Sequence, residues 1–432
     1  MSAGALEWVR SDATAAVLAG LDVALPGLDG LLDLDAVADR FACDWPVAGA
    51  PLTARSVRAQ LARITYEPGH RAVAVYRLAV AEPGAPERRT LGVVEITTTG
   101  THHRLAVDDP AMVGLGEASD GAAMTDRLAA SVTHPVATCA VEPISYRSGA
   151  HCVLRYDLRA GPADGGRTVL FGKVYASGMA TVAERLTELH KCGRLDGRFE
   201  VAGPLDTAPE LGLVVQPEAG GQSLGRRVFD PAAPHSRRLD AEAAGRALAG
   251  LHRCAGPAGP ARALADELED LRARVGLVAA ADPALALRVD TVLDHLQRVA
   301  PAPVTLVPSH GSFRADHVVL QGSRVQLIDL DGYGWSEPAR DAGNLLAYLR
   351  WRALRDPRWS VAVTEVRSGF LAGYAEVAAL DGERCAINEA ASAIKIAVRR
   401  FRRLAVSEWA AVPELIEAAA RLLRGHERVE VR

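Results

Sequence analysis

The 432-residue chain lacks several features that mark particular classes of protein. No apolar run reaches the roughly 18 residues that a membrane-spanning helix needs, so no membrane association is expected. The basic excess of a nucleic-acid-binding protein is also missing, because the formal net charge is −4. The N-terminus has no basic segment followed by an apolar stretch, so no secretory signal is expected. About half of the residues are apolar, which indicates a globular protein with a large core.

Metal-binding cysteine motifs are absent as well. The six cysteines form no Cys-x-x-Cys pair, and the histidines do not cluster at ligand spacing, so a zinc site is not expected. Unpaired thiols in a reducing cytoplasm are the ordinary interpretation, and we expect a cytoplasmic location. The cysteines are Cys43, Cys139, Cys152, Cys192, Cys254 and Cys385.

Lysine is rare. The chain contains only Lys173, Lys191 and Lys395, and arginine supplies the other basic residues. Such a bias is typical of a GC-rich genome. A lysine kept within a predicted strand, as Lys173 is, indicates that a compact ammonium group is needed there.

The apolar pattern predicts an α+β protein with a small β-rich part followed by a larger helical part. Alternating strands and turn residues dominate up to about residue 218, and helical periodicity dominates from about residue 239. A strand pair within 304–330 interrupts the helices. We therefore expect three domains, residues 1–135, 136–218 and 219–432, with a ligand site in a crevice between domains.

The first 170 residues read as a tandem repeat. Residues 64–78 resemble residues 144–158, and residues 25–28 (Leu-Pro-Gly-Leu) resemble residues 112–115 (Met-Val-Gly-Leu) in the same order. The copies differ at one position that matters for chemistry, because the second carries Lys173 roughly where the first carries Glu95. The second copy continues into a predicted helix at 179–191, ending at Cys192-Gly193, whereas no helix is expected after Glu95. We interpret the first copy as a structural appendage.

A polar loop at 310–317, with the sequence His-Gly-Ser-Phe-Arg-Ala-Asp-His, precedes an apolar strand that ends at Asp329 and Asp331. Carboxylates placed by a strand and a loop are typical of magnesium–phosphate sites. Lys173, paired with Glu184 on the following helix, would supply the cation that phosphoryl transfer needs, and Glu188 is the next candidate partner.

The segment that joins the two parts offers Gln216 and Glu218 as further candidates for nucleotide contact.

These residues carry a resemblance to a known family. Residues 144–425 resemble the aminoglycoside phosphotransferase/choline kinase-like family, whose catalytic loop reads His-Gly-Asp-x-x-x-x-Asn, followed by Ile-Asp and then Gly-Asp-Pro-x-x-Asp. Here the corresponding segments are 310–317, Ile328-Asp329 and 336–341 (Ser-Glu-Pro-Ala-Arg-Asp), and Leu251-His252 matches the end of an earlier helix.

The resemblance implies a protein-kinase-like bilobal fold, with ATP or GTP and Mg²⁺ as cofactors. The internal repeat makes residues 1–135 an extra N-lobe-like unit. The resemblance also makes His310 a structural residue of the loop, Asp329 the magnesium ligand and Asp341 a buried brace. Asp331 is a candidate second ligand.

Two residues depart from the family pattern. Ser312 replaces the aspartate that orients the acceptor hydroxyl, and His317 replaces the asparagine that holds a second metal ion. A serine hydroxyl cannot accept a proton at neutral pH, and loss of a general base typically costs about 10²–10⁴-fold in rate. Asp316 or His317 would have to act as the base, with His317 also a candidate metal ligand. The alternative is that Asp316 caps the turn and His317 only packs.

Two functions follow. The first is an ATP-dependent phosphotransferase acting on a hydroxyl of a small molecule or peptide; the second is a pseudokinase that binds nucleotide or serves as a scaffold for a protein partner. Residues 221–225 fit Gly-x-Ser-x-Gly, but Pro217 and a Gly-Gly pair break the strand that a serine hydrolase would need. The arginines at 399, 400, 402 and 403 form either a solvated helix face or a basic rim for an anionic substrate.

Overall fold

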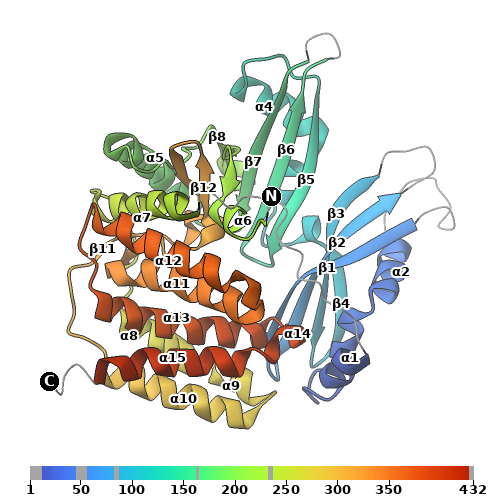
Figure 1. The fold of residues 1–432 in the computed structure, drawn as a ribbon. Helices are drawn as coiled ribbons and strands as arrows, with labels where there is room; N and C mark the ends of the chain where they lie inside the picture. Colours follow the sequence, from blue (N-terminus) through green and yellow to red (C-terminus); the bar gives the residue numbers. More distant parts are fainter. Residues whose placement is uncertain (1–11, 45–55, 82–86, 162–164, 232–236, 428–432) are drawn as a thin grey trace. The chain divides into compact units, whose positions relative to one another are not determined.

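The protein is described here by a computed structural model that covers residues 12–44, 56–81, 87–161, 165–231 and 237–427. Its contacts divide it into two compact units. The β-rich unit comprises the chain up to residue 183 with 204–218 and 402–407, and the helical unit comprises 184–203, 219–401 and 408 onward. The fold is α+β, as expected (Figure 1). Residues 1–11, where a secretory signal was sought, lie outside the described part.

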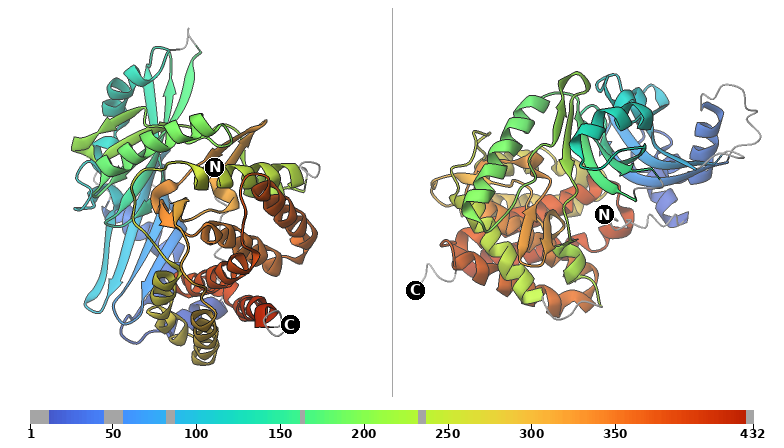
Figure 2. Two further views of the ribbon diagram at one scale, coloured as in Figure 1. Left: turned by 90° about the vertical axis from the view of Figure 1, so that its left-hand side faces the viewer. Right: turned by 90° about the horizontal axis from the view of Figure 1, so that it is seen from above.

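Two antiparallel sheets build the β-rich unit. The first sheet has the order β1-β2-β3-β4 and the second has the order β5-β6-β7-β9-β8. They lie next to each other through β3 and β5 (Figure 2). The strands of the first sheet are β1 (Ser56–Glu67), β2 (Arg71–Ala81), β3 (Arg88–Thr97) and β4 (Gly100–Leu105). Those of the second are β5 (Thr138–Arg147), β6 (His151–Arg159), β7 (Arg167–Tyr175), β8 (Asp206–Ala208) and β9 (Leu213–Pro217).

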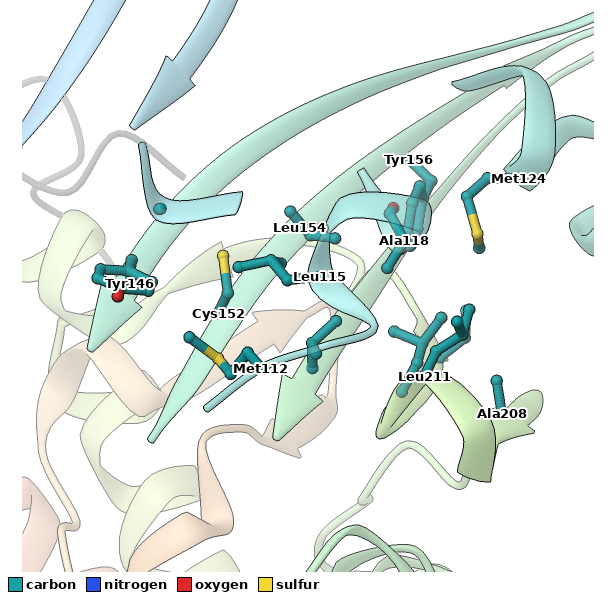
Figure 3. Packing of buried hydrophobic residues seen from close by; sticks show 14 of the residues in the cluster. Met112, Leu115, Ala118, Met124, Tyr146, Cys152, Leu154, Tyr156, Ala208 and Leu211 are labelled. Carbon is teal, nitrogen blue, oxygen red and sulfur yellow. The ribbon is translucent and has the colours of Figure 1, made fainter. Parts of the chain in front are cut away.

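Short helices precede each sheet. They are α1 (Asp12–Ala19) and α2 (Leu34–Asp44) before the first sheet, and α3 (Leu115–Ala118) and α4 (Gly121–Leu128) before the second. The second pair brings Met112, Leu115, Ala118 and Met124 onto the apolar face of the second sheet (Figure 3). Burying this face removes apolar area from water, which stabilises the sheet–helix packing. Gly114 permits the close approach, because a Cβ there would lie 2.4 Å from the Cα of Leu211.

The two sheets share an anchoring pattern. In the first, the Oδ2 of Asp22 accepts hydrogen bonds from the Tyr66 hydroxyl at 2.8 Å and from the Gly69 amide at 2.7 Å. In the second, the Oδ2 of Asp109 accepts from the Tyr146 hydroxyl at 2.5 Å and from the Gly149 amide at 2.9 Å.

A second tyrosine repeats in the same way. Tyr76 donates to the carbonyl of Leu31 at 2.7 Å, and Tyr156 donates to the carbonyl of Ala118 at 2.9 Å. These matched contacts support the internal duplication, which we retain as a proposal. The three-domain division also stays a prediction, since the contacts group both sheets into one unit.

Helices dominate the other unit. The long helices α7 (Arg237–Arg253) and α12 (Ser360–Ala375) pack against each other (Figure 1). The remaining helices are α6 (Leu224–Val228), α8 (Leu264–Arg272), α9 (Val275–Ala279), α10 (Pro283–Arg298), α11 (Pro338–Arg355), α13 (Gly382–Arg402), α14 (Val406–Trp409) and α15 (Val412–Glu427). Short strands lie in the segments between these helices. They are β10 (Gln222–Ser223), β11 (Val307–Ser309), β12 (Val318–Gln321), β13 (Arg324–Leu327) and β14 (Gly334–Ser336).

Two local predictions need comment. The helix expected at 179–191 is α5 (Met179–Asp196), which continues past Gly193. A Cβ at Gly193 would lie 2.7 Å from the carbonyl oxygen of Phe199, so the glycine permits a close approach and does not end the helix. The helix instead stops at Gly197, whose φ of 76° is the left-handed conformation common at helix ends. Ser223 of the Gly-x-Ser-x-Gly segment is the N-cap of α6, accepting from the Arg226 amide at 3.2 Å. No helix among the described residues is both long and apolar enough to cross a membrane.

Candidate active site

Asp341 organises the 310–317 loop from the first turn of α11. Its carboxylate accepts the backbone N–H of His310 at 2.6 Å and that of Gly311 at 2.9 Å. The Nε2 of His252 lies 3.4 Å from the same carboxylate, and the Nδ1 of His252 lies 2.8 Å from the Tyr374 hydroxyl. Burial alone would raise the pKa of Asp341, but the hydrogen bond and charge of His252 outweigh it and lower the pKa to about 2. Asp341 is therefore an ionised brace for the loop.

Two backbone conformations shape the site. Gly311 has a φ of 76°, and a Cβ at this position would lie 1.8 Å from the carbonyl oxygen of Gly332, so only glycine fits. Asp329 also has a left-handed backbone, with φ 60° and ψ 54°, although it is not a glycine. Such strain persists only where surrounding structure imposes it, and it concentrates at functional sites. The Asp329 carboxylate lies just after β13, at this left-handed position.

His310 is fully buried beneath Ser312. Its Nε2 lies 3.0 Å from the carbonyl of Ile328, and its Nδ1 lies 3.4 Å from the Ser312 hydroxyl. Burial lowers the pKa of His310, although Asp341 and Asp329 oppose this effect. The neutral ring therefore donates through Nε2 and accepts through Nδ1. The Ser312 hydroxyl is also 3.5 Å from the Asp329 carbonyl. Its contacts to the His310 ring and to this carbonyl are therefore both long.

His317 lies beside Asp329. Its Nε2 is 3.3 Å from the Oδ2 of Asp329 and accepts a hydrogen bond from the Nε of Arg314 at 2.8 Å. Burial first, then the charge of Arg314, lowers the pKa of His317 well below its ordinary value, so the ring is neutral.

A cation would suit this pair of atoms. The Nε2 of His317 and the Oδ2 of Asp329 both present lone pairs, and no proton lies between them. A metal ion bound by both atoms would replace this repulsion with attraction. The Arg314 hydrogen bond competes for the same nitrogen, so the fit is better for Asp329 than for His317. Asp331 is exposed.

No group of three or more His, Cys, Asp or Glu within the described ranges could hold a metal ion by itself. Mg²⁺ commonly uses only one or two protein carboxylates and takes its other ligands from phosphates and water. Asp329 with His317 is therefore compatible with a metal bound together with a nucleotide, and the three-residue set that includes Asp331 stays a prediction.

Asp316 is engaged elsewhere. The Tyr348 hydroxyl donates to its Oδ2 at 2.7 Å, and its Oδ1 packs so tightly on α6 that a Cβ at Gly225 would come within 2.2 Å. These contacts tie the end of the 310–317 loop to α6 and α11. They favour the structural role of Asp316 over its alternative role as a base.

The nucleotide candidates of the β-rich unit share one face of the second sheet. Leu154, Gly172 and Val215 are aligned across β6, β7 and β9 and face the buried core. Lys173 follows Gly172 and so lies on the opposite face, where Gln216 also lies by its pairing in β9. The ammonium of Lys173 is 5.5 Å from the ring centre of Tyr175.

The remaining candidates are less constrained. Glu218 is exposed, and its amide donates to the Val169 carbonyl at 3.3 Å. Glu184 and Glu188 are exposed on α5. Lys173 and Glu184 belong to different units, so their ion pair stays a prediction.

Three residues that support the loop were missed by sequence reasoning. Asn344 donates to the Phe313 carbonyl at 2.7 Å, Tyr348 holds Asp316, and Arg314 contacts His317. Asn344 and Tyr348 are one helical turn apart, and this spacing after Asp341 is the signal that would have indicated a loop-facing side of α11.

Comparisons with known proteins give the following. The model of a family described as the phosphotransferase enzyme family matches residues 163–380, just over half of the chain. No curated protein matches the chain. A solved choline/ethanolamine kinase family protein from Mesorhizobium loti is 17% identical, with a TM-score of 0.46, over 72% of this chain and 99% of that chain.

Two further solved structures are similar. A macrolide 2′-phosphotransferase from Brachybacterium faecium is 19% identical, with a TM-score of 0.42, over 69% of this chain and 97% of its own. An amicoumacin kinase in complex with AMP-PNP and Ca²⁺ is 15% identical, with a TM-score of 0.47, over 70% of this chain and 94% of its own. At these identities the likeness concerns the fold alone.

Proposed function

Because the chain belongs to the phosphotransferase enzyme family, we propose that it transfers the terminal phosphoryl group of ATP or GTP to a hydroxyl of a small molecule or peptide. Kinase-like members of this family generally use ATP and a divalent metal. The observation that carries the proposal is the strained backbone of Asp329, which presents a carboxylate next to His317 on a loop braced by Asp341.

Each residue has a role that its position supports. A magnesium ion, when bound with the nucleotide, neutralises charge on the phosphates, and Asp329 with His317 beside it would hold that ion. Lys173 would supply the cation for the phosphates, a role that the family resemblance implies. Arg314 places a guanidinium 2.8 Å from His317, where it can stabilise negative charge on the transferred group.

Ser312 orients the acceptor. Its hydroxyl, positioned by the Nδ1 of His310 at 3.4 Å, can hydrogen-bond the acceptor hydroxyl but cannot hold its proton. Phosphoryl transfer passes through a loose transition state and depends mainly on positioning and electrostatics. A slower but genuine reaction is therefore compatible with serine at this position.

Removal of the metal ligand tests the proposal. With ATP, Mg²⁺ and a panel of hydroxyl compounds, we expect ADP and a phosphorylated product from the native protein and at least about a 10²-fold loss in Asp329→Asn. Asp294→Asn, an exposed aspartate on α10, is the control and should retain activity. Absence of product from the native protein, or full activity in Asp329→Asn, would refute the proposal.

Ser312 itself favours a second candidate, a pseudokinase that binds nucleotide or a protein partner without transferring phosphate. This candidate predicts that nucleotide raises the melting temperature while no phosphorylated product forms. Ser312→Asp separates the two, because restoring a carboxylate should raise a pre-existing activity by about 10²-fold or more. A phosphorylated product that appears only in Ser312→Asp would identify the native chain as a pseudokinase.

A further inference from the structure

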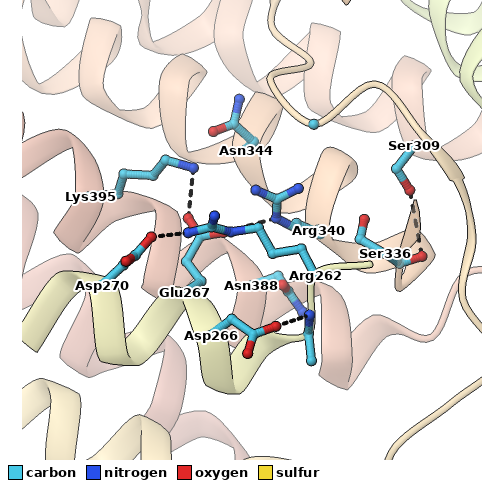
Figure 4. Close-up of polar contacts among 12 residues, drawn as sticks. Arg262, Asp266, Glu267, Asp270, Ser309, Ser336, Arg340, Asn344, Asn388 and Lys395 are labelled. Atoms are coloured by element: carbon cyan, nitrogen blue, oxygen red, sulfur yellow. Dashed lines mark hydrogen bonds and ion pairs between the residues drawn. The ribbon is translucent and has the colours of Figure 1, made fainter. Parts of the chain in front are cut away.

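A charge cluster around the buried Glu267 includes Arg340, a neighbour of the Asp341 that braces the 310–317 loop. Glu267 of α8 forms ion pairs with the Nζ of Lys395 at 2.6 Å and with the Nε of Arg340 at 2.9 Å (Figure 4). The charges of Lys395 and Arg340 overcome the effect of burial and lower the pKa of Glu267 to about 2, so the carboxylate is ionised. One carboxylate therefore meets two cations, and this group of three residues carries one net positive charge.

The same imbalance recurs farther along these helices. Glu389 and Glu408 are both almost completely buried, and each pairs with two arginines. The arginines are Arg350 and Arg367 on Glu389, and Arg355 and Arg400 on Glu408. Each buried acid is thus compensated by two cations, and several of these cation side chains are partly exposed. The helices α11 to α13 thus concentrate positive charge in a chain whose overall charge is negative.

The Glu267 cluster is joined to the catalytic loop. Arg340 immediately precedes Asp341, whose carboxylate holds the amides of His310 and Gly311. Asn344, one turn after Arg340, donates to the Phe313 carbonyl and lies near Lys395 and Arg340 in Figure 4. A group bound by Lys395 would therefore lie next to an ion pair of α11, the helix that positions the loop.

The basic face of α13 continues toward the site. Arg399 follows Lys395 by one helical turn, so the two side chains leave the same face of α13. The positive charge of Arg399 lowers the pKa of Lys395 and also that of His317, where it acts after burial and nearer charges. Arg399 and Lys395 therefore offer two cations on one face of α13.

Lys395 is suited to exchange partners. Its side chain is 30% exposed, whereas that of Glu267 is 7% exposed. If the ammonium turned toward a ligand, Glu267 would keep its ion pair with Arg340 and would not become an uncompensated buried charge. This arrangement lets Lys395 bind an anion without disrupting the packing beneath it.

From these observations we infer that the acceptor is a hydroxyl compound bearing a negatively charged group, a carboxylate or a phosphate ester, which Lys395 and Arg399 hold while the hydroxyl reaches the catalytic loop. The inference rests on the proposed phosphotransfer function and specifies its substrate class. A cationic acceptor would have to lose water beside like charges, which this surface opposes.

The test uses four compounds that share a hydroxyl framework and differ in charge: glucose, glucosamine, gluconate and glucose 6-phosphate. Turnover with ATP and Mg²⁺ is measured by ADP release, and binding in the presence of AMP-PNP is measured by calorimetry. We expect at least one anionic compound to exceed glucose and glucosamine by about tenfold in kcat/KM and in affinity. The gluconate and glucose 6-phosphate arms distinguish a carboxylate from a phosphate ester.

Two variants assign the effect to the proposed residues. Lys395→Gln and Arg399→Gln should each lower affinity for the preferred anion by about tenfold, while the affinity for AMP-PNP remains unchanged. Lys191→Gln, an exposed lysine on α5, is the matched control and should behave as the native protein. Having two variants covers the event that one of them folds poorly.

Each outcome decides a different question. Preference for glucose or glucosamine, no binding of either anion, or anion binding unchanged in both variants would overturn the inference; turnover in such a case would leave the proposed function intact. Anion binding that depends on Lys395 and Arg399 without any phosphorylated product would support the binding site and count against phosphotransfer.

Discussion

The two sheets of the β-rich unit have the same framework and different chemistry. Both are anchored by an aspartate that accepts from a tyrosine hydroxyl and a turn glycine. Lys173 pairs with Val153 in the second sheet, and Glu95 pairs with Val73 at the matching position of the first. Glu95 lies 3.6 Å from Arg71 of its own sheet. The proposed nucleotide role therefore distinguishes two sheets with matching anchors, because it depends on the single side chain of Lys173.

The largest expected effect comes from substituting, one at a time, the side chains that distinguish the two sheets. Lys173→Met should weaken binding of AMP-PNP and reduce turnover by about 10²-fold, because the cation that we propose to contact the phosphates is lost. Glu95→Gln should change neither by more than about twofold, because it removes only an exposed ion pair. Calorimetry and ADP release measure both effects, with Lys191→Met as a charge control. Equal effects of the two substitutions would show that the sheets do not differ in function.

The next largest effect concerns the anchoring aspartates. Asp109→Ala leaves a buried tyrosine hydroxyl and the Gly149 amide without their acceptor and should cost about 3 kcal/mol. Asp22 is less buried, so Asp22→Ala should cost about half as much. Amide hydrogen exchange of the two sheets reports each locally. A greater loss in the first sheet than in the second would contradict the burial argument.

The Asp109–Tyr146 contact should also make the second sheet sensitive to pH. Burial would raise the pKa of Asp109, but the hydrogen bonds from Tyr146, Gly149 and Ala111 lower it overall. Its stabilising contribution is therefore present above the unfolded value of about 3.9 and is lost as pH falls through the lower folded value.

At the alkaline end, burial and the bond to Asp109 raise the pKa of Tyr146 to about 12. This contribution is present below the unfolded value of about 10 and is lost as pH rises toward the folded value. Hydrogen exchange or thermal unfolding in acid and in alkali would reveal both losses. In Asp109→Ala the acid-side dependence should shrink; an unchanged acid limb would rule out this carboxylate as its source.

The smallest effect tests whether the frameworks are energetically equivalent. Tyr76→Phe and Tyr156→Phe each remove one buried hydrogen bond to a backbone carbonyl, and each should cost about 1 kcal/mol. Denaturant unfolding and amide hydrogen exchange of each variant would compare the two losses of stability. A difference of more than about 1 kcal/mol between the two variants would mean that the matched contacts do not carry matched energies.

Much of the architecture could be predicted from local patterns. Alternating residues predicted β6 and β7, and apolar periodicity predicted α7, α10 and the helices after residue 338. The predicted end of α5 was wrong because Gly193, judged from its neighbours in sequence alone, resembles a helix-terminating glycine. In the structure this glycine permits a close approach to the carbonyl of Phe199, a residue beyond the end of the helix, and that contact cannot be read from the local pattern.

The candidate site also has residues that could be predicted from the sequence and residues whose roles could not. Asp329 and the 310–317 loop could be selected from the sequence, since a polar loop followed by a strand that ends in a carboxylate is a local pattern. Asp341 was selected through the family resemblance. The roles of Asp316 and His317 could not be predicted, because both depend on neighbours distant in sequence. Tyr348 is 32 residues from Asp316, and the tertiary fold brings its hydroxyl to that carboxylate.

The sequence by itself determined the α+β class, the phosphotransferase-like loop and the serine that replaces its aspartate, because these are properties of short segments. Tertiary structure alone decided that Asp316 supports α6 and α11, that His317 is neutral beside Asp329, and that Lys395 shares a buried carboxylate with Arg340. Burial and charge at a residue depend on every element packed around it, and that information is not contained in any single stretch of chain.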